Sequence, residues 1–324
     1  MRETVSNNSS IECRPVPRES VWQVLRWIHF DLSKIEFAAL LADVEPRLEA
    51  HPEWTALEVV NGETRIAAAY FICLDGKVAT LGGLRAKAGC ETQSGLVLQE
   101  FQRRLRSAGV AQIQALVDVN NLSSTMVMLN SPFRQATTVR HLWFDLVNIN
   151  CSINWSTDNC STEILAGHTC EPAWRFTRSQ INTLVDATFV GTLDCPDVDG
   201  LRTAAEVVSG FLESKPWDAS LPWWVLCEGE TPCGCMFVNK HLQGIYDLAY
   251  LGLIPSARGR GLGRMLVEFA IGYCRDQGGS IFTTAVDSQN WPAHKIYNSL
   301  GFVEIRELAV WLPKAMKINQ LAAV

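Results

Sequence analysis

The feature of this sequence with the clearest chemical potential is a loop that alternates glycine with bulkier residues, "ARGRGLGRML" over residues 257–266. Its three glycines weaken the start of the apolar, helix-like run that follows, so they need a reason to be there. A glycine-rich turn that opens a helix offers unpaired backbone N–H groups and the positive end of the helix dipole to an anion. Two other interpretations stand beside it: an RNA-binding arginine-glycine segment and a plain surface turn.

The spacing of the loop separates it from two common phosphate-binding motifs. Gly259, Gly261 and Gly263 alternate, whereas a dinucleotide fingerprint has the pattern G-x-G-x-x-G followed by an acidic residue about twenty positions later. The Gly-Lys-Ser/Thr ending of a Walker loop is missing as well. The net charge of −6 argues against a protein that covers phosphate backbones with positive charge, which weakens the RNA interpretation.

The composition is that of a folded, core-forming protein. Apolar residues make up 48% and charged residues 19% of the 324 positions, a length that allows two ordinary domains. No apolar run approaches the ~18 residues of a membrane span, and the polar start "MRETVSNNSS" lacks the apolar core of a signal peptide. We therefore expect a cytoplasmic protein with neither membrane nor nucleic acid as a partner.

The cysteines and histidines do not have the spacing of metal ligands. None of the 11 cysteines forms a C-x-x-C pair, and the 6 histidines are scattered. Cys233 and Cys235 alternate along an expected strand, so they should share one face of it. Buried, reduced thiols in a cytosolic protein are the favoured interpretation, with zinc as the alternative. We expect no metal.

Strands and helices alternate around the loop. Hydrophobic spacing predicts helices at 178–189 and 200–213, and again from Leu262 over "LGRMLVEFAIGYCRDQ". The stretches "GIYDLAYLGLI", "SIFTTAV" and "FVEIRELAVWLP" are typical of strands. A short helix over "NWPAHKIYNSL" should end at Gly301.

A segment of the first half of the chain is similar in sequence to a segment of the second half. Residues 84–121 align with 253–290 without a gap. Asp118 falls on Asp287 and Asn121 on Asn290, each pair 169 positions apart. We infer a tandem duplication. The polar, aperiodic segment around 147–170 is the expected boundary, which gives domains at 1–150 and 165–324.

Two linked motifs in the second half resemble those of a known family. Arg258-x-x-Gly261-x-Gly263 follows a strand and opens a helix, and the next strand leads into Asn290-x-x-Ala293-x-x-x-Tyr297-x-x-x-Gly301-Phe302. This pair resembles the GNAT superfamily of acyl-CoA-dependent N-acetyltransferases, whose acyl-CoA motif is R/Q-x-x-G-x-G/A. The resemblance covers roughly residues 170–313. It implies a mixed α/β (α+β) fold of two tandem GNAT-like domains, each with a twisted, mostly antiparallel sheet flanked by helices and splayed at the acyl-CoA cleft.

The same resemblance implies acetyl-CoA as co-substrate and assigns its contacts. The amides from Gly259 to Arg264 would bind the pyrophosphate, while the pantetheine arm pairs with the preceding strand like an added strand. An amide near Leu253 would polarise the thioester carbonyl. For Arg258 a solvated loop arginine is the alternative. The residues expected at the co-substrate are Leu251, Leu253, Ile254, Arg258, Gly259, Arg260, Gly261, Leu262, Gly263, Arg264, Asn290 and Tyr297.

The expected catalytic residues are Tyr297, Asp247 and Asn290. Tyr297 stands where family members often carry the acid that protonates the departing thiolate; the alternative is a packing role. Asp247 is the leading candidate for the base, and its alternative is a strand-end carboxylate bonded to backbone. We expect Asn290 to order the start of its helix rather than to react, and His294 to lie at the surface or at the cofactor's edge.

The first copy has lost the residues that carry this chemistry. Under the alignment Arg258 corresponds to Gly89, Gly261 to Thr92, Gly263 to Ser94 and Tyr297 to Met128. The apolar helix and strands remain, which indicates a degenerate GNAT-like domain kept as scaffold, substrate wall or partner surface. Gly95 directly follows Ser94, the residue that aligns with Gly263, so a loop shifted by one residue could still contact a ligand.

These observations lead to one functional hypothesis and two alternatives. The hypothesis is direct acetyl transfer from acetyl-CoA to a primary amine of a small-molecule or peptide acceptor. The alternatives are an acyl-CoA-binding regulatory module and a small-molecule acetyltransferase similar to mycothiol synthase, a family member with two domains and one working site. A second copy of the chain, in a homodimer, is a further candidate partner.

Overall fold

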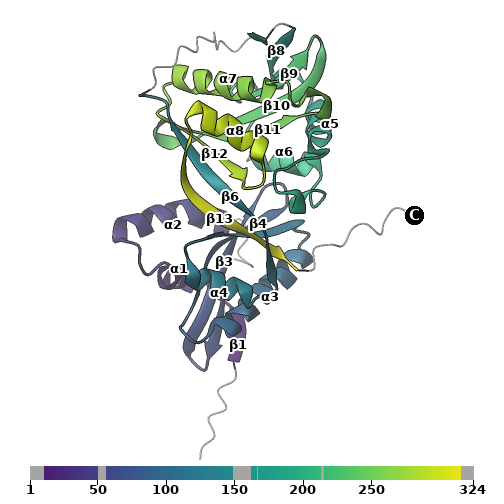
Figure 1. Ribbon diagram of the computed structural model, residues 1–324. Coiled ribbons are helices and arrows are strands. Elements are labelled where there is room, and N and C mark those ends of the chain that lie inside the picture. The colour runs from purple at the N-terminus through teal and green to yellow at the C-terminus, as the bar shows by residue number, and fades with distance from the viewer. Residues whose placement is uncertain (1–10, 50–55, 149–161, 166, 213–214, 315–324) are drawn as a thin grey trace, which may run out of the picture. The chain divides into compact units, whose positions relative to one another are not determined.

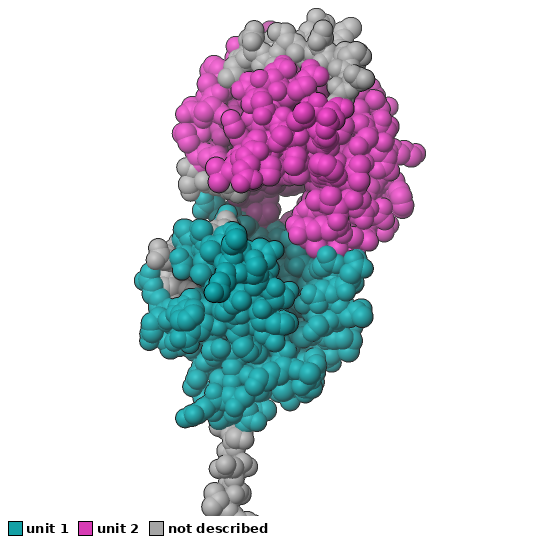
Figure 2. All heavy atoms as spheres, turned by 90° about the vertical axis from the view of Figure 1, so that its left-hand side faces the viewer, with its two compact units in different colours: residues 1–136, 309–324 teal, residues 137–308 magenta. Residues whose placement is uncertain are grey.

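The computed structural model describes residues 11–49, 56–148, 162–165, 167–212 and 215–314. The polar start at 1–10 and most of the expected boundary segment, residues 149–161, lie outside the described residues. The chain divides into two compact units, residues 1–136 with 309–324 and residues 137–308, which Figure 2 colours teal and magenta.

Unit 1 is a sheet with the strand order β1-β2-β3-β4-β5-β13, of which it contains only residues 309–313 of the last strand. Its strands are β1 (Ile11–Pro15), β2 (Leu57–Asn61), β3 (Thr64–Leu74), β4 (Val78–Ala86) and β5 (Gln112–Asp118). Its helices are α1 (Val21–Ile28), α2 (Lys34–Glu49), α3 (Glu91–Ser107) and α4 (Leu122–Leu129). The first four strands pair antiparallel, and β4 pairs parallel with β5. Val97, Leu98 and Phe101 of α3 are buried against this sheet.

Unit 2 has the strand order β13-β6-β12-β11-β10-β9-β8-β7. Its strands are β6 (Phe133–Asp145), β7 (Thr162–Leu165), β8 (His168–Pro172), β9 (Trp223–Glu228), β10 (Thr231–Lys240), β11 (Ile245–Leu253), β12 (Ile281–Asp287) and β13 (Val303–Pro313). Its helices are α5 (Arg178–Phe189), α6 (Ala204–Leu212), α7 (Leu262–Asp276) and α8 (Trp291–Leu300). Helices α7 and α8 share one apolar cluster, and α5 and α6 share another (Figure 1).

The tandem repeat is confirmed by matching elements. Helices α4 and α8 begin at Leu122 and Trp291, which align with each other, and each follows an asparagine cap. The Asn121 side chain accepts from Ser124 N at 3.0 Å, and the Asn290 side chain accepts from Ala293 N at 3.4 Å. The predicted role of Asn290 at the helix start is therefore confirmed, because its oxygen binds an amide that the first helical turn leaves unpaired.

The division into units differs from the sequence-based one at the last strand of each copy. Strand β6 belongs to the first copy, yet most of it lies in unit 2 beside β12. Strand β13 belongs to the second copy, yet residues 309–313 lie in unit 1, and this strand neighbours β5. Since β5 and β12 are equivalent strands with similar patterns, sequence alone could not tell which of them each last strand joins.

Strands β11 and β12 part before either of them ends. Their parallel pairing runs only from Ile245 to Leu248, opposite residues 281–284. Beyond this point β11 continues to Leu253 against β10 alone, and its register shifts where Phe237 and Val238 face it. This separation confirms the predicted splay of a mixed, mostly antiparallel sheet, and it leaves one edge of β11 without a strand partner.

The expectation that Cys233 and Cys235 share a face is wrong. A register shift between Pro232 and Gly234 inserts an irregularity into β10, so Cys233 joins the cluster under α7 while Cys235 joins the cluster under α5. A bulge reverses the alternation of side chains along a strand. Within the described residues, no group of three or more metal-ligating side chains comes together, and no helix is long and apolar enough to cross a membrane.

Candidate acetyl-CoA site

The three glycines of the loop have two different structural roles. Gly259 and Gly261 have φ values of 73° and 82°, a left-handed conformation that glycine adopts with little cost. Gly263 is already helical, and a Cβ placed there would lie 3.3 Å from Ile296 Cδ1 of α8. Two glycines therefore shape the turn, and the third lets α7 pack closely against α8.

The backbone amides of this loop are free to bind an anion. Among the described residues, no acceptor is bound to the amides from Gly259 to Arg264, and the bond that opens α7 runs from Met265 N to Gly261 O at 3.3 Å. Amides at a helix start, together with the helix dipole, favour phosphate. The loop thus fits the pyrophosphate of acetyl-CoA, as the sequence predicts.

The side chains of two loop arginines are held by neighbouring acids. Arg260 forms a two-pronged ion pair with Glu228 at 2.7 and 3.1 Å. Arg264 donates to Glu268 at 2.8 Å and to Ser299 Oγ at 2.6 Å. Exposed pairs of this kind contribute little to stability, but they engage both guanidinium groups with acids of the chain itself. The backbone, rather than these side chains, is then the main anion-binding element.

Arg258 is an anchor rather than a solvated loop arginine. Its Nε donates to Leu253 O at 3.0 Å, Nη1 to Gly191 O at 3.0 Å and Nη2 to Thr188 O at 2.8 Å. The guanidinium therefore ties the end of α5 and the loop after it to the last residue of β11. Three of its five N–H donors are used in this way, so two remain for the predicted contact with the pyrophosphate.

The free edge of β11 presents the groups that an added strand would need. Ile254 N donates to Cys233 O at 3.0 Å on the β10 side, whereas Leu253 O accepts from Arg258 on the other side. Since the N–H and C=O of one residue point the same way and alternate between neighbours, Leu251 and Leu253 direct their N–H groups away from β10. This is the orientation required for the predicted pantetheine pairing and for a donor to the thioester carbonyl.

Tyr297 lies in α8 with its ring buried and its hydroxyl bonded to Thr284. Its ring packs on Phe302 with centroids 5.1 Å apart, so it has the packing role as well. Burial, together with the charges of Asp194 and Asp247, raises the pKa of the phenol to about 12. The hydroxyl therefore stays protonated and can act as a proton donor, but only a weak one.

Asp247 is placed close to Tyr297. It belongs to the last paired stretch of β11, and its Oδ1 accepts from Thr283 Oγ1 at 2.9 Å. Its charge contributes to the raised pKa of Tyr297, which requires the two groups to be near each other. The structure thus brings the predicted acid and the predicted base together where β11 and β12 part.

A second pair of acids at this place was missed by the sequence analysis. Asp287, fully buried at the end of β12, accepts from Cys195 N at 3.0 Å and from Gln289 N at 2.7 Å. Its own amide donates to Asp194 Oδ1 at 3.0 Å. The alignment of Asp118 with Asp287 marked one of these acids as repeated, but no motif marks Asp194, which lies in an irregular loop.

The expected surface position of His294 is wrong. Its side chain is buried, and its Nε2 lies 3.1 Å from Asp287 O. It therefore supports the end of β12 from inside the fold. The sequence did not reveal this, because α8 has only 10 residues and therefore gives little periodicity from which to identify its buried face.

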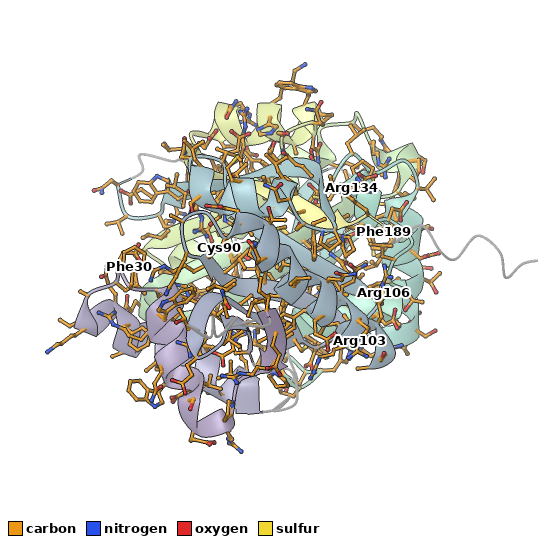
Figure 3. The ribbon with its side chains drawn as sticks, turned by 90° about the horizontal axis from the view of Figure 1, so that it is seen from below. Phe30, Cys90, Arg103, Arg106, Arg134 and Phe189 are labelled. Carbon is orange, nitrogen blue, oxygen red and sulfur yellow. The ribbon has the colours of Figure 1, made fainter. Side chains whose placement is uncertain are left out.

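The first copy has covered its own helix start. Helix α3 begins at Glu91, which aligns with Arg260, whereas α7 begins only at Leu262. The amide of Gly89 donates to Glu91 Oε1 at 3.1 Å, just before the cap residue Cys90, labelled in Figure 3. A carboxylate of the chain itself thus binds a backbone amide just before this helix start.

Two further features close the equivalent place in unit 1. A Cβ on Gly95 would lie 3.0 Å from Asn130 O, so this glycine serves the packing of α3 on the end of α4. A Cβ on Gly82 of β4 would clash with the ring of Tyr70, which packs on that strand. His29 Nε2 holds the Tyr70 hydroxyl at 3.0 Å. The Tyr70 ring therefore packs on one face of β4, on the side of α1.

The repeated mixed α/β fold with one intact glycine loop defines the class of tandem GNAT-fold proteins. Residues 197–302 match the family model described as Acetyltransferase (GNAT) family. Over these residues the chain is therefore similar to GNAT acetyltransferases. Two solved structures share the fold over 93% of this chain: a GCN5-related N-acetyltransferase from Sphaerobacter thermophilus (TM-score 0.58, 15% identity, 94% of its chain) and a tandem GNAT protein from the clavulanic acid biosynthesis pathway (TM-score 0.53, 14% identity, 98% of its chain).

Two curated relatives match part of the chain in sequence. A mycothiol acetyltransferase from Thermomonospora curvata is 38% identical over 90 residues, 28% of this chain and 30% of its own length. A peptidyl-lysine N-acetyltransferase from Salmonella typhimurium is 31% identical over 98 residues, 30% of this chain and 57% of its own length. The chain thus spans less than two thirds of the length of either relative.

Replacing Gly261 with valine should abolish measurable binding of acetyl-CoA. The branched side chain would stand between the amides and the phosphates, and it would strain a residue with φ of 82°. Gly278→Val is the matched control, because Gly278 has φ of 74°, open surroundings and a place outside the loop. Calorimetry on both variants checks this; unchanged affinity of the Gly261 variant would contradict it.

A titration of the whole chain with acetyl-CoA should give one site per chain. Glu91 covers the helix start in unit 1, and helix-dipole attraction of about 0.3–1 kcal/mol is too weak to displace it in favour of a phosphate. The stoichiometry from calorimetry, or co-substrate density in a crystal, measures this. Two sites per chain, or density beside residues 89–95, would show that the first copy still binds.

Proposed function

We propose that this protein transfers the acetyl group of acetyl-CoA to a primary amine by direct attack. The observation that carries the proposal is the row of free amides from Gly259 to Arg264 at the start of α7, which packs at Gly263 against Ile296 of α8, the helix that contains the buried Tyr297. The names of its relatives support it: one is a mycothiol acetyltransferase and the other a peptidyl-lysine N-acetyltransferase. The acceptor is then a small molecule or a peptide that carries an amine.

Each of the residues named in unit 2 has a separate role in the proposed reaction. The loop amides hold the pyrophosphate of the substrate, and Leu253 N donates to the thioester oxygen as negative charge develops there. Asp247 takes a proton from the amine, which then attacks the carbonyl carbon. A base is needed because an amine with a pKa of about 10.4 is neutral only about once in 2,500 molecules at pH 7. Tyr297 gives its proton to the sulfur as the C–S bond breaks.

The raised pKa of Tyr297 limits how this last step can proceed. A phenol with a pKa of about 12 that protonates a thiolate whose acid has a pKa of about 8.5 works uphill by about 3.5 pKa units, or roughly 5 kcal/mol. If the thiolate formed fully before the proton moved, the whole free-energy difference between phenol and thiol would add to the barrier. Proton transfer and C–S cleavage must therefore occur together.

An acyl-CoA-binding regulator is the alternative function. It would retain the glycine loop but would have no use for an acid and a base beside the end of the β11–β12 pairing. The presence of Asp247 and Tyr297 at that point favours the enzyme. A screen of acetyl-CoA turnover against a library of amines separates the two: slow thioester hydrolysis that no amine accelerates would identify the regulator.

Tyr297→Phe should lower kcat while leaving the dissociation constant of acetyl-CoA nearly unchanged. The hydroxyl acts as the thiolate leaves, whereas the ring, which packs on Phe302, is retained in phenylalanine. Steady-state kinetics under conditions where chemistry limits the rate, with calorimetry of acetyl-CoA, checks both parts. Wild-type turnover in this variant would leave Tyr297 with its packing role alone.

Asp247→Asn should remove the acidic limb of the pH profile of kcat/KM for the amine. A base must lose its proton to act, so activity falls toward low pH in the wild type, and an amide cannot titrate in this way. Thr283→Val is a useful companion, since it removes the hydroxyl that donates to Asp247 while keeping the carboxylate. An unaltered profile and rate in Asp247→Asn would move the role of base to another group.

A further inference from the structure

Unit 1 keeps a free strand edge although it has lost the glycine loop. Strand β4 pairs with β5 only over residues 78–80, yet it continues to Ala86 against β3 alone. Lys87 N donates to Ile66 O on the β3 side. Because the direction of these groups alternates along a strand, Ala86 and Leu84 direct their N–H and C=O groups to the free edge. Among the described residues, no strand pairs with either of them.

The end of this edge differs between the two copies. Leu84 aligns with Leu253, but Ala86 aligns with Pro255, which has no N–H. Unit 1 therefore offers an amide at a position where unit 2 has none. An extended peptide that is added to a sheet edge bonds to it at every second residue, so it would use both Leu84 and Ala86. The edge of β4 thus fits a peptide strand.

The side chain of Arg85 lies on β4 between these two residues. A Cβ on Gly83 would meet the His29 ring, so the end of α1 lies on this face of the strand. Arg85, two residues further on the same face, donates from Nη1 to Trp27 O. Its guanidinium carbon lies 4.8 Å from the centroid of the Trp27 ring and 3.7 Å from that of Phe30, labelled in Figure 3. Only one of its five N–H donors is used in this way, so the others are available to a ligand.

No acid of the described chain neutralises Arg85. None of the ion pairs among the described residues includes it. Glu58 of the neighbouring β2 binds other cations, Arg14 Nε at 3.0 Å and Arg65 Nε at 2.7 Å. The two aromatic rings hold the Arg85 guanidinium through cation–π contacts. A planar guanidinium held in one orientation is prepared to bind a carboxylate through two parallel N–H···O bonds.

We propose that unit 1 binds an acidic peptide segment of a partner protein, which adds to the free edge of β4 as a further strand. Opposite residues on neighbouring strands have Cβ atoms about 4.5–5.5 Å apart, so an aspartate or glutamate opposite Arg85 reaches its guanidinium. The main-chain bonds to Leu84 and Ala86 supply affinity, and Arg85 supplies the preference for an acid. This binding needs neither acetyl-CoA nor the residues of the proposed reaction.

A display library of random ten-residue peptides, selected on the full chain, supplies the probe. We expect the enriched peptides to share one aspartate or glutamate among β-branched residues. Arg85→Met removes the charge but keeps an apolar side chain between the two rings. It should weaken binding of a selected peptide by about tenfold or more in fluorescence polarisation, because a charge-assisted pair is lost. Arg106→Met removes an equal charge from the exposed end of α3 and should leave the affinity unchanged.

Ala86→Pro tests the strand edge separately from the charge. It removes an N–H that faces away from β3, and unit 2 has Pro255 at the aligned position, so the fold should tolerate the change. The affinity for the selected peptide should fall by about tenfold, while the melting temperature and the affinity for acetyl-CoA stay the same. In the wild type, the bound peptide should slow hydrogen exchange at residues 81–87 and leave 259–264 unchanged.

Three results would overturn the inference. They are a library from which no acidic peptide is enriched, peptides whose affinity is unchanged by both Arg85→Met and Ala86→Pro, and protection by the peptide outside residues 81–87 alone. Absence of amine turnover in the wild type would contradict the proposed function of unit 2 but would leave the peptide site in unit 1 standing, so the two failures are distinguishable.

Discussion

Strand β11 loses β12 as a partner after Leu248 but continues for five more residues against β10. Backbone groups on that edge would otherwise be satisfied by the next strand, and here they are left to a ligand. The same separation lets the loop after β11 turn outward, so that its amides and the start of α7 open at the end of the free edge. It also leaves Asp247 and Tyr297 at the last point where the two strands meet. Each proposed contact with acetyl-CoA depends on this one interruption of the sheet.

The two copies differ in how the groups around such an opening are satisfied. In unit 1, β4 and β5 also stop pairing early, with 78–80 opposite 112–114. There the Tyr70 ring packs on a face of the free strand, and Glu91 binds the amide of Gly89 just before the helix start. Buried or half-buried polar groups need partners, so a site that no longer binds a ligand tends to acquire internal ones. The contrast supports the interpretation that free amides in unit 2 are kept for binding.

Local patterns predicted much of this structure. The helix at 178–189 and the boundaries around α7 and α8 followed from apolar spacing and from Asn290 and Gly301 as caps. Apolar spacing did not predict that β6 pairs with β12 of the second copy while the end of β13 lies in unit 1. The two possible partner strands, β5 and β12, have similar sequences. The prediction that Cys233 and Cys235 share a face was wrong, because one bulge in β10 reverses the alternation of side chains between the two faces of the strand. The spacing of the residues does not reveal such a bulge. The roles of Arg258 and Asp194 depend on contacts with residues far away in the sequence, which no local motif encodes.

Hydrogen exchange of the whole chain, with and without acetyl-CoA, tests directly whether the backbone amides of the glycine loop bind the co-substrate. The account holds that the amides from Gly259 to Arg264 exchange freely in the unliganded protein and donate to the pyrophosphate when it binds. It predicts that acetyl-CoA slows exchange in the peptide that covers 259–264 and leaves the peptide that covers 89–95 unchanged. Binding of acetyl-CoA with no protection at 259–264, or with protection at 89–95 instead, would contradict the account.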